Sequence, residues 1–157
     1  IEARNLQPYH IFMASFLAGL NEMGMLNQAS VNVASRRAGR YLAEYAKARH
    51  DLPASSGAVT EDAKSFVDYL NRVIGLATQV EVKDGPDGLQ MRVVSSSCSF
   101  CPKGVGEAEL QGTLCPYPGL IDEFVNSLLP ADTSLRLVTS DRRPMVKRED
   151  GCFIQLS

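Results

Sequence analysis

Residues 80–93, which read VEVKDGPDGLQMRV, decide the fold class of this chain. On both sides of residues 84–88, apolar side chains alternate with polar ones, which is typical of a strand with one buried face. The segment between the two runs, DGPDG, is rich in the residues that form tight turns. The sequence therefore predicts a β-hairpin here.

Two further strands are expected in the C-terminal part of the chain. Leu135 and Leu137 mark the third strand, and residues 151–156 form the fourth. Because alternate side chains of a strand point to the same face, one face of the fourth strand carries Cys152, Ile154 and Leu156. These two strands make a second hairpin.

Apolar residues recur at helical spacing in four other segments. Residues 8–26 are apolar around most of the helix circumference. Ser30 predicts the N-cap of a second helix that stops before His50, and Thr60 predicts the cap of a third. The fourth helix lies within residues 116–130, between prolines that mark its two ends.

This order of elements predicts a single α+β domain over residues 1–157. We expect N-terminal helices packed on an antiparallel sheet, with a cysteine-rich loop and one further helix inserted between two hairpins. The composition, 45% hydrophobic and 22% charged, is typical of a soluble globular protein. The net charge of −2 gives no support for a nucleic-acid partner, and no stretch has the length and apolarity expected of a membrane span.

Four cysteines form the candidate metal site: Cys98, Cys101, Cys115 and Cys152. The Cys-x-x-Cys spacing of the first two brings two sulfurs to one edge of a metal tetrahedron, and a third cysteine follows after a loop. A chain of this length and apolar content does not need disulfides, which favours a reducing, cytoplasmic location. The pattern predicts a metal site, with a redox-active pair or inert buried thiols as the alternatives.

Zinc is the expected metal, and an iron–sulfur cluster is the alternative cofactor. Four thiolates around Zn²⁺ leave no open position, so the site would be structural. The usual iron–sulfur sequences place three cysteines closer together than they stand here. Cys115 lies just ahead of a helix N-terminus, whose partial positive charge is expected to lower the pKa of its thiol.

Three segments resemble the 4-vinyl reductase (hydrocarbon-binding) domain family, which is related to the Golgi-transport ligand-binding fold. They are SRRAGR at residues 35–40, Cys115-Pro116 with Gly119 and an apolar helix, and DGCFI at residues 150–154. The resemblance implies a small cytosolic domain with an apolar ligand pocket and a zinc ion held by cysteines beside it. Cys115 and Cys152 match family ligand positions.

One departure from the family pattern bears on the metal. The additional cysteine that the family usually carries a few residues before the last one would fall within residues 144–147, where this chain has none. We expect Cys98 and Cys101 to supply the missing sulfurs.

The resemblance places the ligand cavity on the seam between the helices and the sheet. The side chains expected to line it are on the inward faces of their elements: Phe66, Leu70, Met91, Val93, Tyr117 and Leu120. Few polar anchors are available there, which favours a hydrophobic or aromatic ligand held by burial of apolar area. A packed core without a cavity is the alternative.

The expected function is therefore the binding of a small apolar molecule. No Ser-His-Asp set, nucleophile elbow or close carboxylate pair is recognisable in the sequence. The sequence therefore favours a binding protein over an enzyme. One alternative is a metal- or iron–sulfur-dependent redox enzyme or accessory protein that uses the same cysteines. The other is an assembly adaptor without a ligand, because the first helix is apolar nearly all round and predicts a homodimer through Phe12, Phe16 and Leu20. A helix buried in the core of a monomer is the alternative to this dimer.

Overall fold

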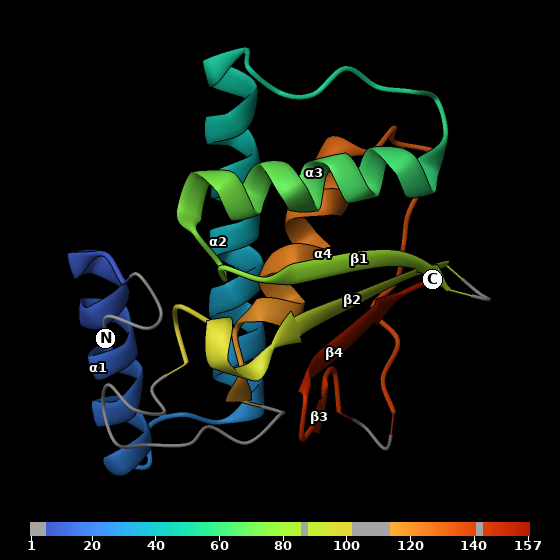
Figure 1. Ribbon diagram of the computed structural model, residues 1–157. Coiled ribbons are helices and arrows are strands. Elements are labelled where there is room, and N and C mark those ends of the chain that lie inside the picture. The colour runs from blue at the N-terminus through green and yellow to red at the C-terminus, as the bar shows by residue number, and fades with distance from the viewer. Residues whose placement is uncertain (1–5, 86–87, 102–113, 141–142) are drawn as a thin grey trace.

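The computed structural model describes residues 6–85, 88–101, 114–140 and 143–157 (Figure 1). The elements run in the order α1 (Pro8–Glu22), α2 (Gln28–Arg49), α3 (Val59–Ile74), β1 (Val80–Gly85), β2 (Gly88–Val94), the short 3-10 turn η2 (Ser95–Ser97), α4 (Tyr117–Leu128), β3 (Val146–Arg148) and β4 (Gly151–Leu156). This order confirms the α+β class. Most of the loop between the second and third cysteines, residues 102–113, lies outside the described residues.

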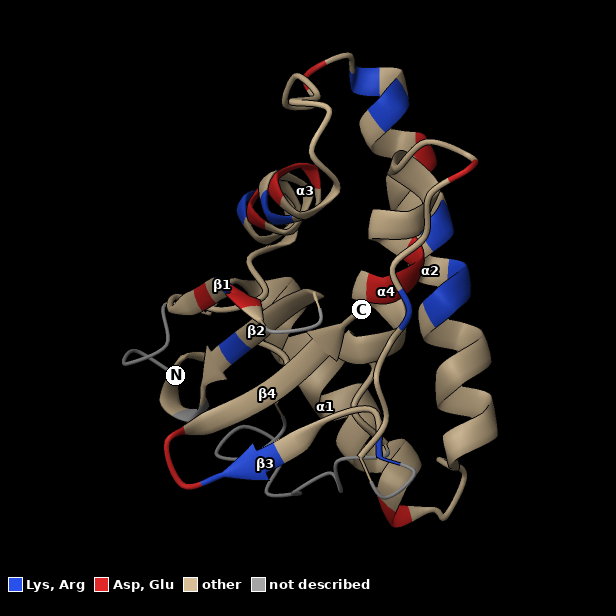
Figure 2. Ribbon diagram, turned by 90° about the vertical axis from the view of Figure 1, so that its right-hand side faces the viewer, with Lys and Arg blue, Asp and Glu red and all other residues tan. Residues whose placement is uncertain are grey.

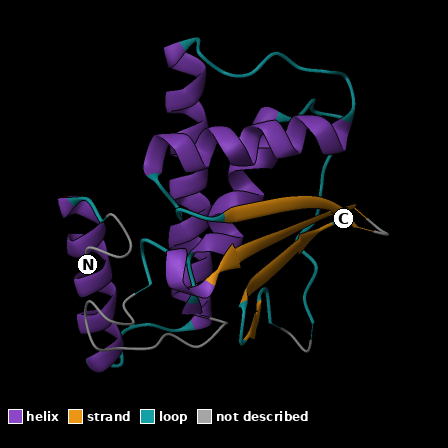
Figure 3. Cartoon of the chain, viewed as in Figure 1, coloured by secondary structure: helices purple, strands orange, loops and turns teal. Residues whose placement is uncertain are grey.

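The four strands form one antiparallel sheet in the order β1-β2-β4-β3. Met91 in β2 pairs with Val82 on one side and with Ile154 on the other, so the predicted first hairpin is confirmed. Figure 3 shows the helices gathered to one side of the strands. The sheet residues that are buried in the core are Leu89, Met91, Val93, Ile154 and Leu156.

The predicted third strand was wrong in its position. The structure places β3 at Val146–Arg148, and Leu137 makes only an isolated bridge to Leu156. The backbone N–H of Arg136 donates to the Ser157 carbonyl oxygen at 2.6 Å, so this segment does run along the edge of β4. Its pairing stops after a few bonds because β3 occupies the same edge closer to the start of β4.

Two predicted helix caps were also misplaced. Asn27 rather than Ser30 caps α2: its side-chain oxygen accepts the Ser30 N–H at 3.0 Å, and the Ser30 hydroxyl accepts the Asn27 N–H at 3.2 Å. The helix ends as expected, since His50 adopts the left-handed conformation at φ 57°. Thr60 lies inside α3, which begins at Val59. Each predicted N-cap lies within one helical turn of the observed one. Several residue types can cap a helix, so the sequence does not decide between positions this close together.

Helices α2 and α4 cross at very close range. A Cβ atom placed at Gly39 would overlap the Leu120 carbonyl oxygen, and one at Gly119 would overlap the Ser35 hydroxyl. Ion pairs flank this crossing, with an Arg36 nitrogen 2.5 Å from an Asp122 carboxylate oxygen. Figure 2 shows the basic residues of α2 beside the acidic residues of α4. Much of the segment at residues 35–40 therefore serves the packing of two helices.

The hydrophobic core fills the space between the inner face of the sheet and helices α3 and α4. Its largest fully buried side chains include Phe124, Leu70 and Ile121. Helix α1 lies apart from this core, beside one end of α2 (Figure 1). None of the helices in the described ranges is long and apolar enough to cross a membrane.

Candidate functional site

An apolar cavity of about 410 Å³ lies between α1, α2 and the start of α4. Helix α1 contributes Met13, Phe16, Leu17 and Leu20 to its wall, and α2 contributes Val31, Ala34, Ser35 and Ala38. The far wall comes from Phe100, Pro116, Tyr117 and Leu120. None of the described residues that line the cavity is charged, and their polar side-chain groups are the hydroxyls of two serines and one tyrosine.

The N-terminal end of α1 is fastened to the end of α3. The Tyr9 hydroxyl donates to the Ile74 carbonyl oxygen at 2.8 Å, and His10 Nε2 lies 3.1 Å from the same oxygen. His10 Nδ1 accepts the backbone N–H of Gln7 at 3.0 Å, so the neutral ring carries its proton on Nε2 and donates it to Ile74. The buried His10 ring also meets Phe100 edge to face, with centroids 4.9 Å apart.

The two faces of α1 differ in burial. His10, Ala14 and Ala18 recur every four residues and are buried against the body of the protein. Phe12 and Phe16 stack on each other at 6.0 Å and are 66% and 52% exposed. Because Phe16 also lines the cavity, the exposed side of α1 forms part of the cavity mouth.

The structure brings the four predicted cysteines into one neighbourhood, and none of the four forms a disulfide. The pKa of Cys98 is well above its ordinary value. The largest cause is a hydrogen bond between the Cys98 and Cys101 thiols, and burial of the Cys98 thiol is the second. Burial raises the pKa of Cys115 to about 12, and the nearby Cys152 and Cys101 add to that rise. Cys152 is on β4, opposite Val93 in β2 and Lys147 in β3.

The expected lowering of the Cys115 pKa at the helix N-terminus was therefore wrong. The N–H of Tyr117 does act in the expected direction, but burial of the thiol outweighs it. The raised pKa values keep the thiols of Cys98 and Cys115 protonated at neutral pH, and a thiol is a poorer nucleophile than a thiolate.

The thiols are near one another without being arranged as a metal site. Across the described ranges, no three cysteine, histidine, aspartate or glutamate side chains form a group that could hold a metal ion. The donor chemistry, four thiols from three parts of the chain, suits zinc. The positions of those donors do not fit it, and the side chains would have to move closer together before three of them could share one ion.

The predicted ligand residues divide into two groups. Tyr117 and Leu120 line the cavity, as expected of them. The other four are buried in the core between α3 and the sheet and line no part of this cavity: Phe66, Leu70, Met91 and Val93. The cavity thus lies on the α1 side of α2 and α4 rather than on the seam with the sheet.

The α1 residues of the wall were missed as ligand contacts. Their signal was visible in the apolar circumference of residues 8–26, which the sequence assigned to a dimer interface or to a buried core helix. Ala34 and Ala38 on α2 give a second signal, because small side chains there leave room between two helices.

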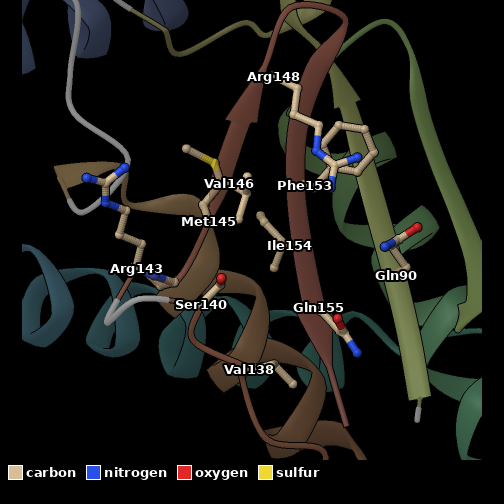
Figure 4. Close-up of a pocket in the computed structure, with 11 residues that line it drawn as sticks. Gln90, Val138, Ser140, Arg143, Met145, Val146, Arg148, Phe153, Ile154 and Gln155 are labelled. Atoms are coloured by element: carbon tan, nitrogen blue, oxygen red, sulfur yellow. The ribbon is translucent and has the colours of Figure 1, made fainter. Parts of the chain in front are cut away.

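A second cleft, of about 200 Å³, lies along β4 and the segment that leads into β3 (Figure 4). The Arg148 guanidinium stacks 4.8 Å from the centre of the Phe153 ring. Arg143 lies at the opposite side of the cleft and points away from that ring (Figure 4). These two cations do not converge on a common point, so the described lining of the cleft forms no recognisable anion site.

Comparison with known proteins places most of the chain in one family. The family model described as MJ0207 family matches residues 24–157. The chain belongs to the MJ0207 family. The matched residues contain all four cysteines and both helices of the close crossing, whereas α1 precedes them.

Two similar proteins come from Methanocaldococcus jannaschii. The protein MJ0207 is 28% identical over 129 residues, which covers 82% of this chain and 74% of the relative. The protein MJ1342 is 24% identical over 94 residues, covering 59% of this chain and 77% of the relative. Both relatives are described as uncharacterized. No solved structure matches the chain.

Proposed function

We propose that this domain binds a small hydrophobic or aromatic molecule in the cavity beneath α1. The observation that carries the proposal is a cavity of about 410 Å³ whose lining, in the part of the chain that the structure describes, carries no charge. Its volume is within the range of roughly 300–1,000 Å³ that small-molecule sites occupy. Burial of apolar area contributes about 25 cal/mol per Å², which must exceed the cost of immobilising the ligand.

The lining also restricts the ligand to uncharged molecules. An ion buried without a partner loses several kcal/mol of hydration, on the order of the whole binding energy of a weak ligand. The Tyr117 hydroxyl already donates to the Leu76 carbonyl oxygen at 2.6 Å, so its proton is not available to a ligand. A neutral, mostly hydrocarbon ligand is therefore preferred.

The resemblance to the 4-vinyl reductase domain family supports this function. Ser35 and Leu120 lie at the close crossing of α2 with α4, and both also line the cavity. Pro116, directly after Cys115, lines it as well. We include in the proposal a cytoplasmic location, which the absence of disulfides among the four cysteines favours, and a structural zinc ion. The support for the ion is the donor set of four thiols alone, since these thiols form no metal-holding group in the described residues.

Titration with the neutral fluorophore N-phenyl-1-naphthylamine tests the proposal. Its emission should rise and shift to the blue on binding, because the apolar lining is a less polar surrounding than water. Ala34→Trp, which fills the cavity from an exposed position on α2, should weaken binding by about tenfold or more, a loss of about 1.4 kcal/mol. Ala48→Trp, on the same helix and equally exposed but outside the cavity, is the matched control and should bind normally.

Two results would contradict the proposal. One is the absence of any saturable emission change with the wild-type protein. The other is equal affinity of the Ala34 and Ala48 variants for the fluorophore, since that would place the binding elsewhere on the surface.

A further inference from the structure

Of the hydroxyl groups that line the cavity beneath α1, two are already engaged within the protein. The Ser30 hydroxyl belongs to the cap of α2, where it accepts the Asn27 N–H at 3.2 Å and donates to the Asn27 carbonyl oxygen at 3.0 Å. The Tyr117 hydroxyl donates to the Leu76 carbonyl oxygen at 2.6 Å and is also hydrogen-bonded to the Cys98 side chain. Each of these two hydroxyls therefore has two hydrogen bonds without a ligand.

The Ser35 hydroxyl differs from both. Its one hydrogen bond within the described part of the chain goes to the Asn32 carbonyl oxygen, at 3.3 Å. O–H···O bonds in proteins are usually shorter, about 2.5–3.0 Å. A hydroxyl oxygen can accept two further bonds, and no described residue donates one to Ser35. Ser35 is 4% exposed, so bulk water does not take the place of the missing donor.

The fold holds this hydroxyl at the floor of the cavity. Ser35 lines the cavity from α2, at the point where α2 crosses α4. Gly119 on α4 makes room for the hydroxyl, because a Cβ atom at residue 119 would overlap the Ser35 oxygen. The mouth, by contrast, is formed by exposed apolar side chains such as Phe16. The cavity therefore combines an apolar mouth with a hydroxyl at its floor that lacks a donor.

This arrangement favours one class of ligand over others of the same shape. Small-molecule sites are lined mostly by apolar side chains, and a few polar groups fix the orientation of the ligand. Ser35 lacks a donor rather than an acceptor, because its own proton is directed to Asn32. A ligand hydroxyl supplies that donor and recovers in the cavity a hydrogen bond that it gives up on leaving water. An ether, a ketone or a hydrocarbon supplies none.

We propose that the cavity selects a neutral alcohol whose body is otherwise hydrocarbon, and that Ser35 is the specificity-determining residue. The Ser35 oxygen accepts the hydrogen bond from the ligand O–H at the cavity floor. The hydrocarbon body of the ligand packs against the apolar walls that α1 and α2 provide. This inference rests on the proposed function of the cavity and names its class of ligand.

Three bicyclic compounds of nearly the same shape test the role of Ser35: borneol donates and accepts hydrogen bonds, camphor only accepts them, and bornane does neither. Their affinities are measured by displacement of N-phenyl-1-naphthylamine from the purified full chain, with the wild type and with Ser35→Ala. The substitution should lower the affinity for borneol about fivefold, the typical effect of one hydrogen bond, and leave those for camphor and bornane nearly unchanged. Ser127→Ala, at a serine of α4 outside the cavity, is the matched control and should bind all three compounds as the wild type does.

Bornane reports whether the cavity itself survives the substitution, because this compound makes no hydrogen bond. Equal losses of affinity for all three compounds, or no loss for any of them, would overturn the role of Ser35 and leave the ligand site standing. A loss for camphor as large as that for borneol would overturn the selection of an alcohol, as would a fluorophore that borneol cannot displace from the wild type. If the wild type binds neither the fluorophore nor any of the three compounds, the proposed function fails as well.

Discussion

Gly39 on α2 lies so close to Leu120 on α4 that a Cβ atom at residue 39 would overlap the Leu120 carbonyl oxygen. The same atom would approach the Phe124 backbone nitrogen to 3.0 Å. Backbone atoms cannot rotate away as a side chain can, so only glycine allows the two helices to cross at this distance. The crossing in turn places Ser35 and Leu120 at the floor of the cavity.

Gly39→Ala should therefore destabilise the domain although alanine favours helices. Overpacking of this kind costs about 1–3 kcal/mol, which outweighs the gain of up to about 1 kcal/mol in helix propensity. The measurement is the free energy of unfolding in urea. Gly19→Ala is the matched control, because no atom lies within 4 Å of its Cβ position in α1, and it should be neutral or slightly stabilising. A Gly39 variant as stable as the Gly19 variant would contradict the close crossing.

The elements of this fold could be predicted from the sequence where local signals decide. The alternation around residues 84–88 gave the first hairpin, and the prolines near residues 116–130 gave α4. The third strand could not be placed, because residues 135–138 and 146–148 compete for one edge of β4 and either run is short. Such a choice depends on the tertiary fold rather than on local pattern.

The cavity could not be located from the sequence for a similar reason. Its position depends on how α1 is fastened, and the contacts that fasten it join residues 64 and 65 positions apart, at His10 and Tyr9 on one side and Ile74 on the other. Spacing along the chain groups Cys98, Cys101 and Cys115 in the sequence, whereas Cys152 joins them through its strand and the family resemblance. The balance between burial and the helix N-terminus at Cys115 required the structure.

Asp62 should make the start of α3 sensitive to acid. Its carboxylate accepts hydrogen bonds from the Ser55 hydroxyl at 2.5 Å, the Ser56 N–H at 2.6 Å and the Ser56 hydroxyl at 2.8 Å. These bonds hold the pKa of Asp62 below its ordinary value of 3.8. The stability they contribute is present above pH 3.8 and is lost as the pH falls through the lowered pKa of the folded state.

Asp62→Asn isolates this contribution. The variant should unfold at lower urea concentration than the wild type at pH 7, and the difference between the two proteins should shrink as the pH is lowered below about 4. Asp68→Asn, at an exposed position of the same helix, is the control and should show little difference at either pH. A stability difference for Asp62→Asn that grows toward acid would refute the assignment.

The exposed side of α1 should mediate a homodimer. Phe12 and Phe16 form a stacked apolar pair on the surface, and α1 carries no charged side chain before Glu22. Because Phe16 and Leu20 also line the cavity, a second copy seated on them would cover its mouth.

Light scattering at micromolar concentration should give the dimer mass, and Phe12→Arg should give the monomer because it places like charges on both copies. Tyr45→Arg, at an exposed aromatic position on α2, should remain dimeric. A monomer mass for the wild type would count decisively against this interface.

Cys101→Ser should abolish the proposed zinc binding and lower thermal stability. We expect one zinc ion per chain with at least three sulfur ligands, and the Cys101 thiol already hydrogen-bonds to Cys98 and lies near Cys115. Removing one thiolate from a structural site removes binding free energy that is coupled to folding, so the melting temperature with zinc present should fall by about 5 °C or more. Elemental analysis and a thermal melt with and without EDTA measure both effects.

Ser96→Ala, an exposed change in the neighbouring turn, is the control and should keep the metal. Purified wild-type protein should be colourless, since a visible absorption band would instead indicate an iron–sulfur cluster at the same cysteines. Unchanged metal content in the Cys101 variant would show that the ion, if present, is held elsewhere.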